Sequence, residues 1–368
     1  MKKKICILKW VIDTSGGGEK VAISLANELA KKEEYEVHLI GITSEAEAPF
    51  FEVSDKVIYT NFIYQKPRPK IYRYFWTAVR KLRKYIKNHD IDLVLAVGIT
   101  TNIIALAGTL GTKAKLVVSE HTSIQMDNDY KPSAARRLLG AKFADCVVTL
   151  TQEERRQYIK KYHLPDDKVI CIPNWMEPLA SDVTYDSSSK CLITVGRFAP
   201  EKGYDLLAQV AQRVLSKYPD WQWDIYGTGS LAIKSALENA LADAGVEHQV
   251  NLRGAVLGTE NIYPGHSIYV LPSRFEGFGL VLLEAKQYGL PVVGFNCPTG
   301  PADIVIDGVN GYLVTPYDID DISDKISLLI EQESKRRDFS ERSMLDTEKF
   351  QKDTIMNQWD HLVHQLCP

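Results

Sequence analysis

The sequence lacks several features that would point to other classes of protein. Its six cysteines are scattered and none forms a Cys-x-x-Cys pair, which favours reduced, buried thiols over a disulfide framework or a zinc site. The net charge of −3 argues against general nucleic-acid binding. No run approaches the about 18 consecutive apolar residues of a membrane-spanning helix, and no internal repeat or low-complexity segment is present.

Strand and helix patterns alternate along the whole chain, which predicts βα units and parallel sheets. With 368 residues, two domains are expected. The patterns place one α/β domain at 1–175, a linker rich in Pro, Ser and Asp at 176–190 and a second α/β domain at 191–345. The tail 346–368 contains an amphipathic helix.

The individual elements follow from hydrophobic periodicity. Strands are expected at 4–12, 36–42, 57–61, 92–97, 115–119, 146–150 and 169–172 in the first series, and at 191–196, 221–226, 249–253, 267–273, 291–295 and 311–314 in the second. Helices are expected at 19–31, 72–87, 134–142, 152–161, 203–217, 231–244, 319–331 and 350–366, and around Glu284.

The most informative segment is Ser273-Arg-Phe-Glu-Gly-Phe-Gly-Leu-Val-Leu-Leu-Glu-Ala285. It places Glu276 in a glycine-bearing loop and Glu284 eight positions later in an apolar helix. The loop follows a buried strand, and in open α/β sheets ligands bind where strands end and helices begin. Backbone N–H groups there favour an anion, while the carboxylates can accept hydrogen bonds from hydroxyls. The combination is typical of a nucleotide-sugar site.

Two cations follow the strand at 191–196. Arg197 and Lys202 lie in a loop that leads into a helix. A nucleoside diphosphate gains negative charge as the bond to its sugar breaks, and fixed cations stabilise that charge. Arginine can grip phosphate oxygens with two N–H groups, whereas lysine acts as a compact charge.

These motifs resemble glycosyltransferase family 4, a retaining family with the GT-B fold. The resemblance covers nearly the whole chain, and its further motifs are Gly196–Gly203, Gly227-Thr-Gly229, Gly16-Gly-Gly18 and Ser119-Glu-His121. It implies two Rossmann-like, doubly wound parallel-sheet domains with a cleft between them, and a C-terminal helix that packs back on the first domain.

The resemblance also implies roles for single residues. Glu276 and His121 would contact the donor sugar, Arg197 and Lys202 the leaving diphosphate, and Glu284 the ribose hydroxyls. Further donor-binding residues would be Gly196, Gly227, Gly229, Arg253, Gly277, Phe278, Gly279 and Leu280, with the 299–303 segment beside the sugar. The acceptor side would include Gly16, Gly17, Gly18 and Lys20.

No metal and no cofactor are expected. Transfer with retention is expected to occur by front-side displacement, in which the leaving phosphate helps deprotonate the incoming hydroxyl and Glu276 positions the sugar. Metal-dependent relatives of another fold use an Asp-x-Asp motif. Its matches here, Asp90/Asp92, Asp127/Asp129 and Asp318/Asp320, are not expected beside the donor motifs.

The segment 66–87 contains nine basic residues, no acidic residue and five aromatic residues. It could lie on anionic lipid, or it could be a solvated helix face beside a core-facing aromatic stripe. The basic start at Met1–Lys4 precedes a run that Lys9 interrupts, which indicates a strand rather than a signal peptide. We therefore expect a cytoplasmic protein, with peripheral contact at the inner face of the membrane if the segment binds lipid.

The expected function is transfer of a hexose from a sugar nucleotide, with UDP-Gal, UDP-GalNAc or UDP-Glc as donors, to a glycan or lipid-linked acceptor in bacterial surface polysaccharide synthesis. One alternative is a sugar-nucleotide epimerase or hydrolase on the same two-domain plan. Another is a nucleotide-sugar-binding protein without enzymatic activity.

Overall fold

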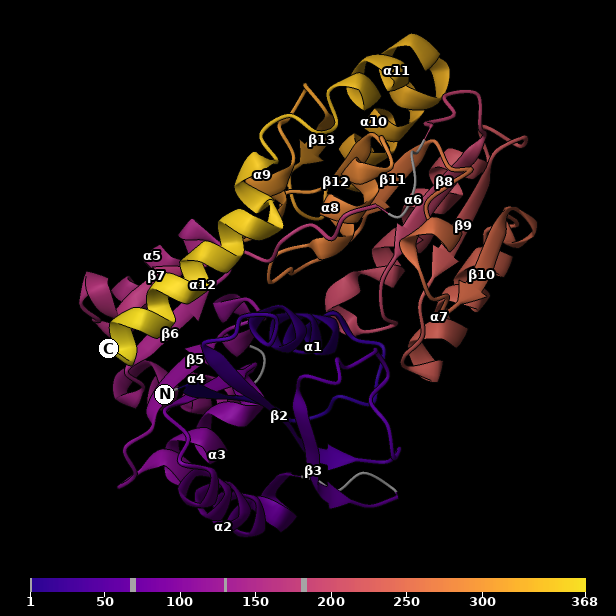
Figure 1. Cartoon of the computed structure of the whole chain (residues 1–368). Helices are drawn as coiled ribbons and strands as arrows, with labels where there is room; N and C mark the ends of the chain where they lie inside the picture. Colours follow the sequence, from indigo (N-terminus) through magenta and orange to yellow (C-terminus); the bar gives the residue numbers. More distant parts are fainter. Residues whose placement is uncertain (1, 67–70, 129–130, 180–183) are drawn as a thin grey trace. The chain divides into compact units, whose positions relative to one another are not determined.

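The computed structural model describes residues 2–66, 71–128, 131–179 and 184–368. The chain forms two compact units (Figure 1): Met1–Asn174 with Lys352–Pro368, and Trp175–Gln351. Each unit is built around a single parallel sheet.

The first unit contains a seven-stranded sheet in the order β3-β2-β1-β4-β5-β6-β7. In neighbouring strands Lys9 pairs with Val97 and Val97 with Ser119, so the carboxyl ends of β1, β4 and β5 are level. The strands are β1 (Lys3–Lys9), β2 (Tyr35–Ser44), β3 (Ile58–Tyr64), β4 (Leu93–Val97), β5 (Lys115–Ser119), β6 (Cys146–Thr149) and β7 (Val169–Cys171). The continuous apolar runs of β1 and β4 are typical of parallel strands covered on both faces.

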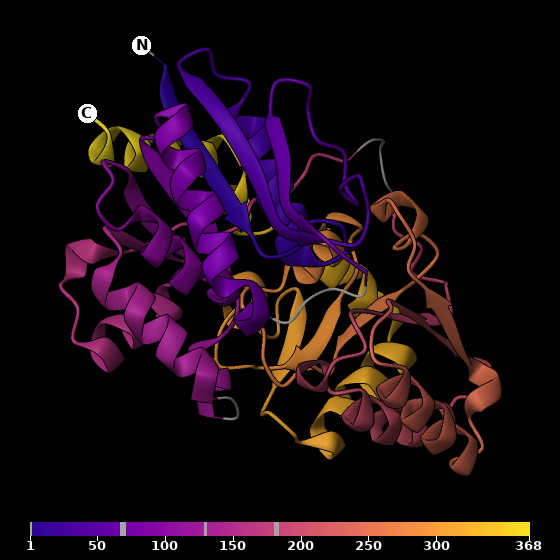
Figure 2. The same ribbon diagram turned by 90° about the horizontal axis from the view of Figure 1, so that it is seen from below.

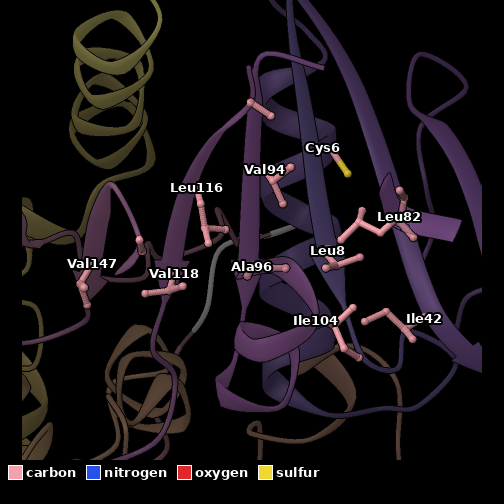
Figure 3. Close-up of a cluster of buried hydrophobic side chains, with 14 of the residues drawn as sticks. Cys6, Leu8, Ile42, Leu82, Val94, Ala96, Ile104, Leu116, Val118 and Val147 are labelled. Carbon is pink, nitrogen blue, oxygen red and sulfur yellow. The ribbon is translucent and has the colours of Figure 1, made fainter. Parts of the chain in front are cut away.

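Helices cover both faces of this sheet. Figure 3 shows Leu82 and Ile104 packed with side chains of the central strands, including Leu8 and Val94. Figure 2, seen from below, shows α2 in front of the sheet, and Figure 1 shows α1 and α12 on the side opposite α2 and α3. The helices are α1 (Gly17–Leu29), α2 (Ile71–His89), α3 (Ile99–Thr109), α4 (Lys131–Phe143), α5 (Gln152–Tyr162) and α12 (Lys352–Leu366).

The last helix is bonded to the first unit. Lys352 Nζ lies 3.1 Å from Glu28 Oε1, and Tyr35 donates a 3.2 Å hydrogen bond to Asp360 Oδ1. The apolar side of α12 is buried, with Trp359 only 6% exposed.

Sequence patterns did not predict α3. Its sequence, Ile-Thr-Thr-Asn-Ile-Ile-Ala-Leu-Ala-Gly-Thr, contains no charged residue and several β-branched residues of low helix propensity. The helix packs between α2 and α4, and even Thr101 and Asn102 are buried. A helix that is buried on most sides lacks the polar stripe from which amphipathic helices are recognised.

The second unit contains a six-stranded parallel sheet in the order β10-β9-β8-β11-β12-β13. The strands are β8 (Cys191–Val195), β9 (Gln222–Tyr226), β10 (Val250–Gly254), β11 (Ile268–Leu271), β12 (Val292–Phe295) and β13 (Gly311–Val314). Side chains of α6 (Tyr204–Leu215), α7 (Leu231–Asp243), α10 (Ile319–Glu331) and α11 (Glu333–Glu341) pack with strand residues such as Trp223 and Ile225 in one core cluster. The remaining helices are α8 (Leu280–Gln287) and the short α9 (Pro301–Ile304).

Two open parallel sheets with flanking helices confirm the predicted α/β class with Rossmann-like units. Residues 180–183 of the expected linker lie outside the described residues. Beyond them, the Tyr185 hydroxyl donates to the Ser267 carbonyl at 2.8 Å, which ties this stretch to the second unit. In the described ranges, none of the helices combines the length and apolarity that a membrane crossing requires.

Candidate functional site

The strand order of the second unit reverses between β8 and β11, which are neighbours in the sheet. The loop 196–203 leaves β8 and the loop 272–279 leaves β11. In open parallel sheets, the crevice beyond the carboxyl ends of the strands at such a reversal is the usual ligand site. The two segments that the sequence singled out therefore emerge side by side at this position.

Lys202 and Glu276 meet directly between these loops. The lysine Nζ lies 2.7 Å from Oε1 and 2.9 Å from Oε2 of the glutamate. Their side chains are 19% and 7% exposed. The backbone carbonyl of Glu276 accepts a 2.7 Å hydrogen bond from the Thr299 hydroxyl, so both ends of the glutamate are fixed.

A second ion pair joins the loop 272–279 to the first turn of α6. Arg274 Nη1 lies 2.8 Å from Asp205 Oδ1 and 3.1 Å from the carbonyl of Pro200. Gly203, with φ +66°, lies so close to β11 that a Cβ atom there would be 2.0 Å from the carbonyl of Pro272. Sequence analysis missed the Arg274–Asp205 pair because the two residues are 69 positions apart and belong to no common motif.

Arg197 contacts Glu201 rather than the Lys202–Glu276 pair. Its side chain is 66% exposed, and Nη2 lies 3.3 Å from Glu201 Oε1. An exposed ion pair of this length contributes little stability, so the guanidinium can reorient at low cost. Of the two predicted diphosphate ligands, the structure brings only Lys202 to Glu276.

Gly227 and Gly229 have a structural reason to be glycine. Their φ angles are +144° and +152°, and added Cβ atoms would lie 1.9 Å from the Gly196 carbonyl oxygen and 2.6 Å from that of Phe198. The glycine turn after β9 thus packs on the loop after β8. This packing does not test whether a diphosphate approaches these glycines, so that role stays a prediction.

The predicted anion-binding amides lie at the start of α8. Gly279, with φ +95°, is the N-cap residue and Leu280 is the first helical residue. Phe278 is buried and its ring contacts Phe350 edge-on at 5.4 Å. A Cβ at Gly300 would lie 2.3 Å from the Phe278 carbonyl oxygen. The predicted 299–303 segment therefore packs on the loop 272–279, which also contains Gly277.

A buried tyrosine holds Glu284. The Tyr263 hydroxyl donates a 2.7 Å hydrogen bond to Glu284 Oε2. Burial, followed by the nearby Glu284 charge, raises the pKa of Tyr263 well above its ordinary value, so its proton remains available to the carboxylate. Sequence analysis did not identify Tyr263, since no motif marks it.

Arg253, predicted to bind the donor, lies in β10 and is paired with Asp224. Its Nε is 2.9 Å from Asp224 Oδ2, and Asn251 Nδ2 is 2.8 Å from Oδ1. Burial alone would raise the pKa of Asp224, but hydrogen bonds from His266, Arg253 and Asn251 outweigh it and lower the pKa to about 2.

One group of possible metal ligands occurs among the residues that the structure describes: Cys191, Asp224 and His266, whose ligand atoms lie within 4.8 Å of one another. Cys191 is the first residue of β8, at the opposite end of that strand from Gly196. A guanidinium and an amide already bond the oxygens of Asp224. These contacts fit a buried carboxylate better than a metal ligand.

The Asp-x-Asp matches have other partners. Asp90 and Asp92 precede β4, at its amino end, and their Oδ1 atoms lie 2.8 and 3.0 Å from Lys113 Nζ. Asp318 caps α10 through a 2.9 Å hydrogen bond from the amide of Asp321, and Asp320 pairs with Arg213. Asp129 lies outside the described residues, so the structure does not test the Asp127/Asp129 match.

In the first unit, His121 lies just beyond the carboxyl end of β5. Its Nε2 is 3.0 Å from the Ser119 hydroxyl. Burial, assisted by the positive charge of Lys9, lowers the pKa of His121 to about 3, so the imidazole is neutral near pH 7. Lys9, which ends β1, was not identified as a site residue; its Nζ lies 3.7 Å from Glu19 Oε1.

The glycine run lies at the same edge. Gly16 is the N-cap residue of α1, Gly17 and Gly18 begin the helix, and Lys20 lies in its first turn. A Cβ at Gly18 would be 2.7 Å from Lys9 Nζ. The predicted acceptor-side residues and His121 therefore share the carboxyl edge of the first sheet, whereas the predicted donor residues belong to the second unit.

Comparison with known families gives a match for each half of the chain. Residues 15–178 match the family described as "Glycosyltransferase Family 4", and residues 179–345 match "Glycosyl transferases group 1". The two matches are adjacent and together cover most of the chain.

The proteins that are similar to this chain include two bacterial glycosyltransferases and one O-GlcNAc transferase of known structure. An uncharacterized glycosyltransferase of Haemophilus influenzae is 29% identical over 357 residues, 97% of this chain and 99% of that protein. The amylovoran biosynthesis glycosyltransferase AmsD of Erwinia amylovora is 24% identical over 370 residues, 98% of this chain and 99% of that protein. The crystal structure of the pneumococcal O-GlcNAc transferase GtfA in complex with UDP and GlcNAc has a TM-score of 0.63 and 26% identity, and the match covers 77% of this chain and 59% of that one.

Proposed function

The chain belongs to glycosyltransferase family 4, the group 1 glycosyltransferases, and we propose that it moves a hexose with retention from a uridine diphosphate sugar to a glycan or lipid-linked acceptor. The observation that carries the donor assignment is the Lys202–Glu276 pair at the sheet reversal, beside the amino end of α8. The UDP in the GtfA complex supports the choice of base, and a galactosyl, N-acetylgalactosaminyl or glucosyl group is proposed. The likeness to AmsD supports a role in bacterial surface polysaccharide synthesis.

The donor would be held by charges of opposite sign. Lys202, which is bonded to Glu276 in the loop before α8, and the amides of Gly279 and Leu280 at the start of α8 would bind the diphosphate, because the N–H groups at a helix amino end favour an anion. Arg197, exposed at the start of the same loop, would turn onto the diphosphate. These groups stabilise the charge that develops on the leaving phosphate, as a metal ion does in other enzymes, so we propose metal-independent transfer.

Glu276 would position the sugar rather than attack it. Both of its oxygens are bonded to Lys202, which reduces the nucleophilicity of the carboxylate. This arrangement supports front-side displacement, with the leaving phosphate accepting the proton of the incoming hydroxyl. His121, a neutral hydrogen-bonding group, is proposed to contact the donor sugar, and Gly16–Gly18 with Lys20 to line the acceptor side.

Calorimetry with a panel of nucleoside diphosphates and sugar nucleotides tests the donor assignment. The protein should bind one nucleoside family at micromolar concentration, and Glu284→Ala should abolish that binding. Glu238→Ala, on the exposed side of α7, is the matched control. If every donor fails to bind, or if Glu284→Ala binds as the wild type does, the donor site is wrongly placed.

We further propose that α2 contacts the inner face of the membrane. Cations along α2 are exposed, among them Arg80, Lys84 and Lys87, and Trp76 is 68% exposed. Tyr74, Phe75 and Tyr85 pack against the core instead, so Trp76 alone of the described aromatic side chains in 66–87 is exposed. Arg68 and Lys70, and the side chain of Tyr72, lie outside the described residues.

Removal of these charges tests the lipid contact. Each cation near an anionic lipid surface contributes on the order of 1 kcal/mol. The triple variant Arg80→Gln/Lys84→Gln/Lys87→Gln should bind anionic vesicles more weakly than the control Arg156→Gln/Lys160→Gln/Lys161→Gln on α5. Equal binding by the two variants would leave α2 as a solvated helix face.

A further inference from the structure

The helix α4 exposes large apolar side chains and buries a charged one. Leu138, Leu139 and Phe143 are exposed, at 42%, 40% and 67%. Arg137 is 1% exposed, and the small residues Gly140 and Ala141 beside it are also buried. On this helix the large apolar side chains face outward, whereas an arginine and small residues face inward, the reverse of an ordinary amphipathic helix.

The inward side is fixed by polar contacts. Arg137 Nη1 donates to the carbonyl of Thr122 at 3.0 Å, and Nη2 donates to the Thr122 hydroxyl at 3.1 Å. Arg137 Nη1 also lies 3.6 Å from Glu154 Oε1. A Cβ at Gly140 would lie 3.0 Å from Asn102 Nδ2 on α3, so close packing requires a small residue here. Rotation of α4 to bury its leucines would break the buried arginine's contacts, which is costly.

The outward side carries positive charge and no negative charge. The sequence 131–143 contains basic residues and no acidic residue, and Lys142 is exposed between the leucines and Phe143. Exposed apolar side chains beside cations are typical of a helix that lies in the interface of an anionic bilayer. The helix α3 packs against both α4 and the basic α2, which keeps the two cationic helices in the same part of the unit.

A second copy of the chain would fit this surface less well. In a two-fold symmetric dimer the same patch meets itself, so Arg136 and Lys142 of both copies would be brought together. The helix offers no acidic side chain to offset that repulsion. Charge complementarity therefore favours an anionic lipid surface as the occupant.

We propose that α4 docks on anionic lipid by inserting Leu138, Leu139 and Phe143 into the headgroup region. This apolar contact is additional to the electrostatic contact proposed for α2. It does not depend on catalysis, so its test and the test of the transferase assignment can fail separately.

Co-sedimentation with vesicles of phosphatidylcholine and phosphatidylglycerol measures the contact. The variant Leu139→Ser/Phe143→Ser should bind at least about tenfold more weakly than the wild type, because it removes apolar area that enters the bilayer. Leu231→Ser/Leu257→Ser is the matched control, since these leucines are 79% and 61% exposed in the second unit. Its binding should equal that of the wild type.

Insertion can also be observed directly. In a Trp76→Phe background, which keeps five other tryptophans, Phe143→Trp should give a blue shift on addition of anionic vesicles that the background protein alone does not show. Unchanged sedimentation of Leu139→Ser/Phe143→Ser, or no blue shift, would overturn the proposal. So would wild-type protein that is dimeric without vesicles and becomes monomeric in this double variant, because a second copy would then be the occupant.

Discussion

The ammonium group of Lys202 lies within 2.9 Å of both carboxylate oxygens of Glu276, so these two of the predicted site residues are each other's partners. Both side chains are largely buried. Removal of one partner would leave an uncompensated charge in the site, whereas removal of both would not.

Substitution of Lys202 and substitution of Glu276 should change the affinity for UDP in different ways. Lys202→Met is expected to weaken UDP binding and to destabilise the fold by about 3 kcal/mol, because Glu276 is left buried and charged. Glu276→Gln releases Lys202, so UDP should bind at least as tightly as to the wild type, while sugar transfer falls by about 100-fold. Calorimetry, thermal unfolding and UDP release measure these quantities. Loss of UDP affinity in Glu276→Gln as large as in Lys202→Met would contradict this assignment.

Loss of the hydrogen bond from Tyr263 to Glu284 should weaken binding of the nucleotide rather than of the sugar. Tyr263→Phe removes a 2.7 Å contact and leaves the carboxylate less well oriented. We expect UDP affinity to fall about fivefold, in line with the loss of one hydrogen bond to a charged group. If Glu284 contacts the ribose, 2′-deoxy-UDP should lose much less affinity in the variant. Equal losses for both nucleotides would place Glu284 away from the ribose.

His121 should remain neutral at all pH values at which the protein is folded and active. Its pKa in the folded protein lies below the ordinary value of 6.5, so it adds no pH dependence above that value. As the pH falls from 6.5 toward 3, the unfolded chain binds a proton that the folded protein does not, and stability decreases.

The histidine prediction is checked by pH-dependent unfolding and by NMR. His121→Gln should lose less thermal stability than the wild type between about pH 7 and about pH 5. Lys9→Met should raise the pKa of His121, because it removes a positive charge that disfavours the imidazolium. Nitrogen-15 spectra that show a charged imidazole at pH 6 would contradict the prediction.

Metal removal should leave activity and stability unchanged. The Cys191, Asp224 and His266 group is already bonded to Arg253 and Asn251 through Asp224. Extensive dialysis against EDTA is therefore expected to change neither the melting temperature nor the rate of sugar transfer. Loss of either property, and its recovery on addition of Mg²⁺, Mn²⁺ or Zn²⁺, would restore a metal to the mechanism.

Much of the fold could be predicted because parallel strands carry a strong local signal. The apolar run of β11 and the glycine turn after β9 were both identified at the correct places. The helix α3 was missed for a physical reason. It is buried on most sides by α2 and α4, so its own sequence lacks the alternation of apolar and polar residues that marks a surface helix.

The site was predictable to the extent that its residues lie in local motifs. Glu276 and Lys202 each belong to such a motif, but their direct contact depends on the pairing of β8 with β11. Tyr263 and Asp205 belong to no motif and are placed only by the tertiary fold, so sequence patterns could not find them. The inverted orientation of α4 was hidden for the same reason, since the burial of Arg137 depends on Thr122 and Glu154.

The assignment of Lys352–Pro368 to the first unit has a consequence for biosynthesis. The ribosome must complete all of Trp175–Gln351 before α12 emerges. Until then, the surface that later buries Ile355, Met356, Trp359, Leu362 and Val363 remains uncovered on the nascent chain. Exposed apolar surface of this kind promotes aggregation and chaperone binding. A stop codon shortly before residue 352 would thus damage the domain that is translated first, although every residue of its sheet had already been made.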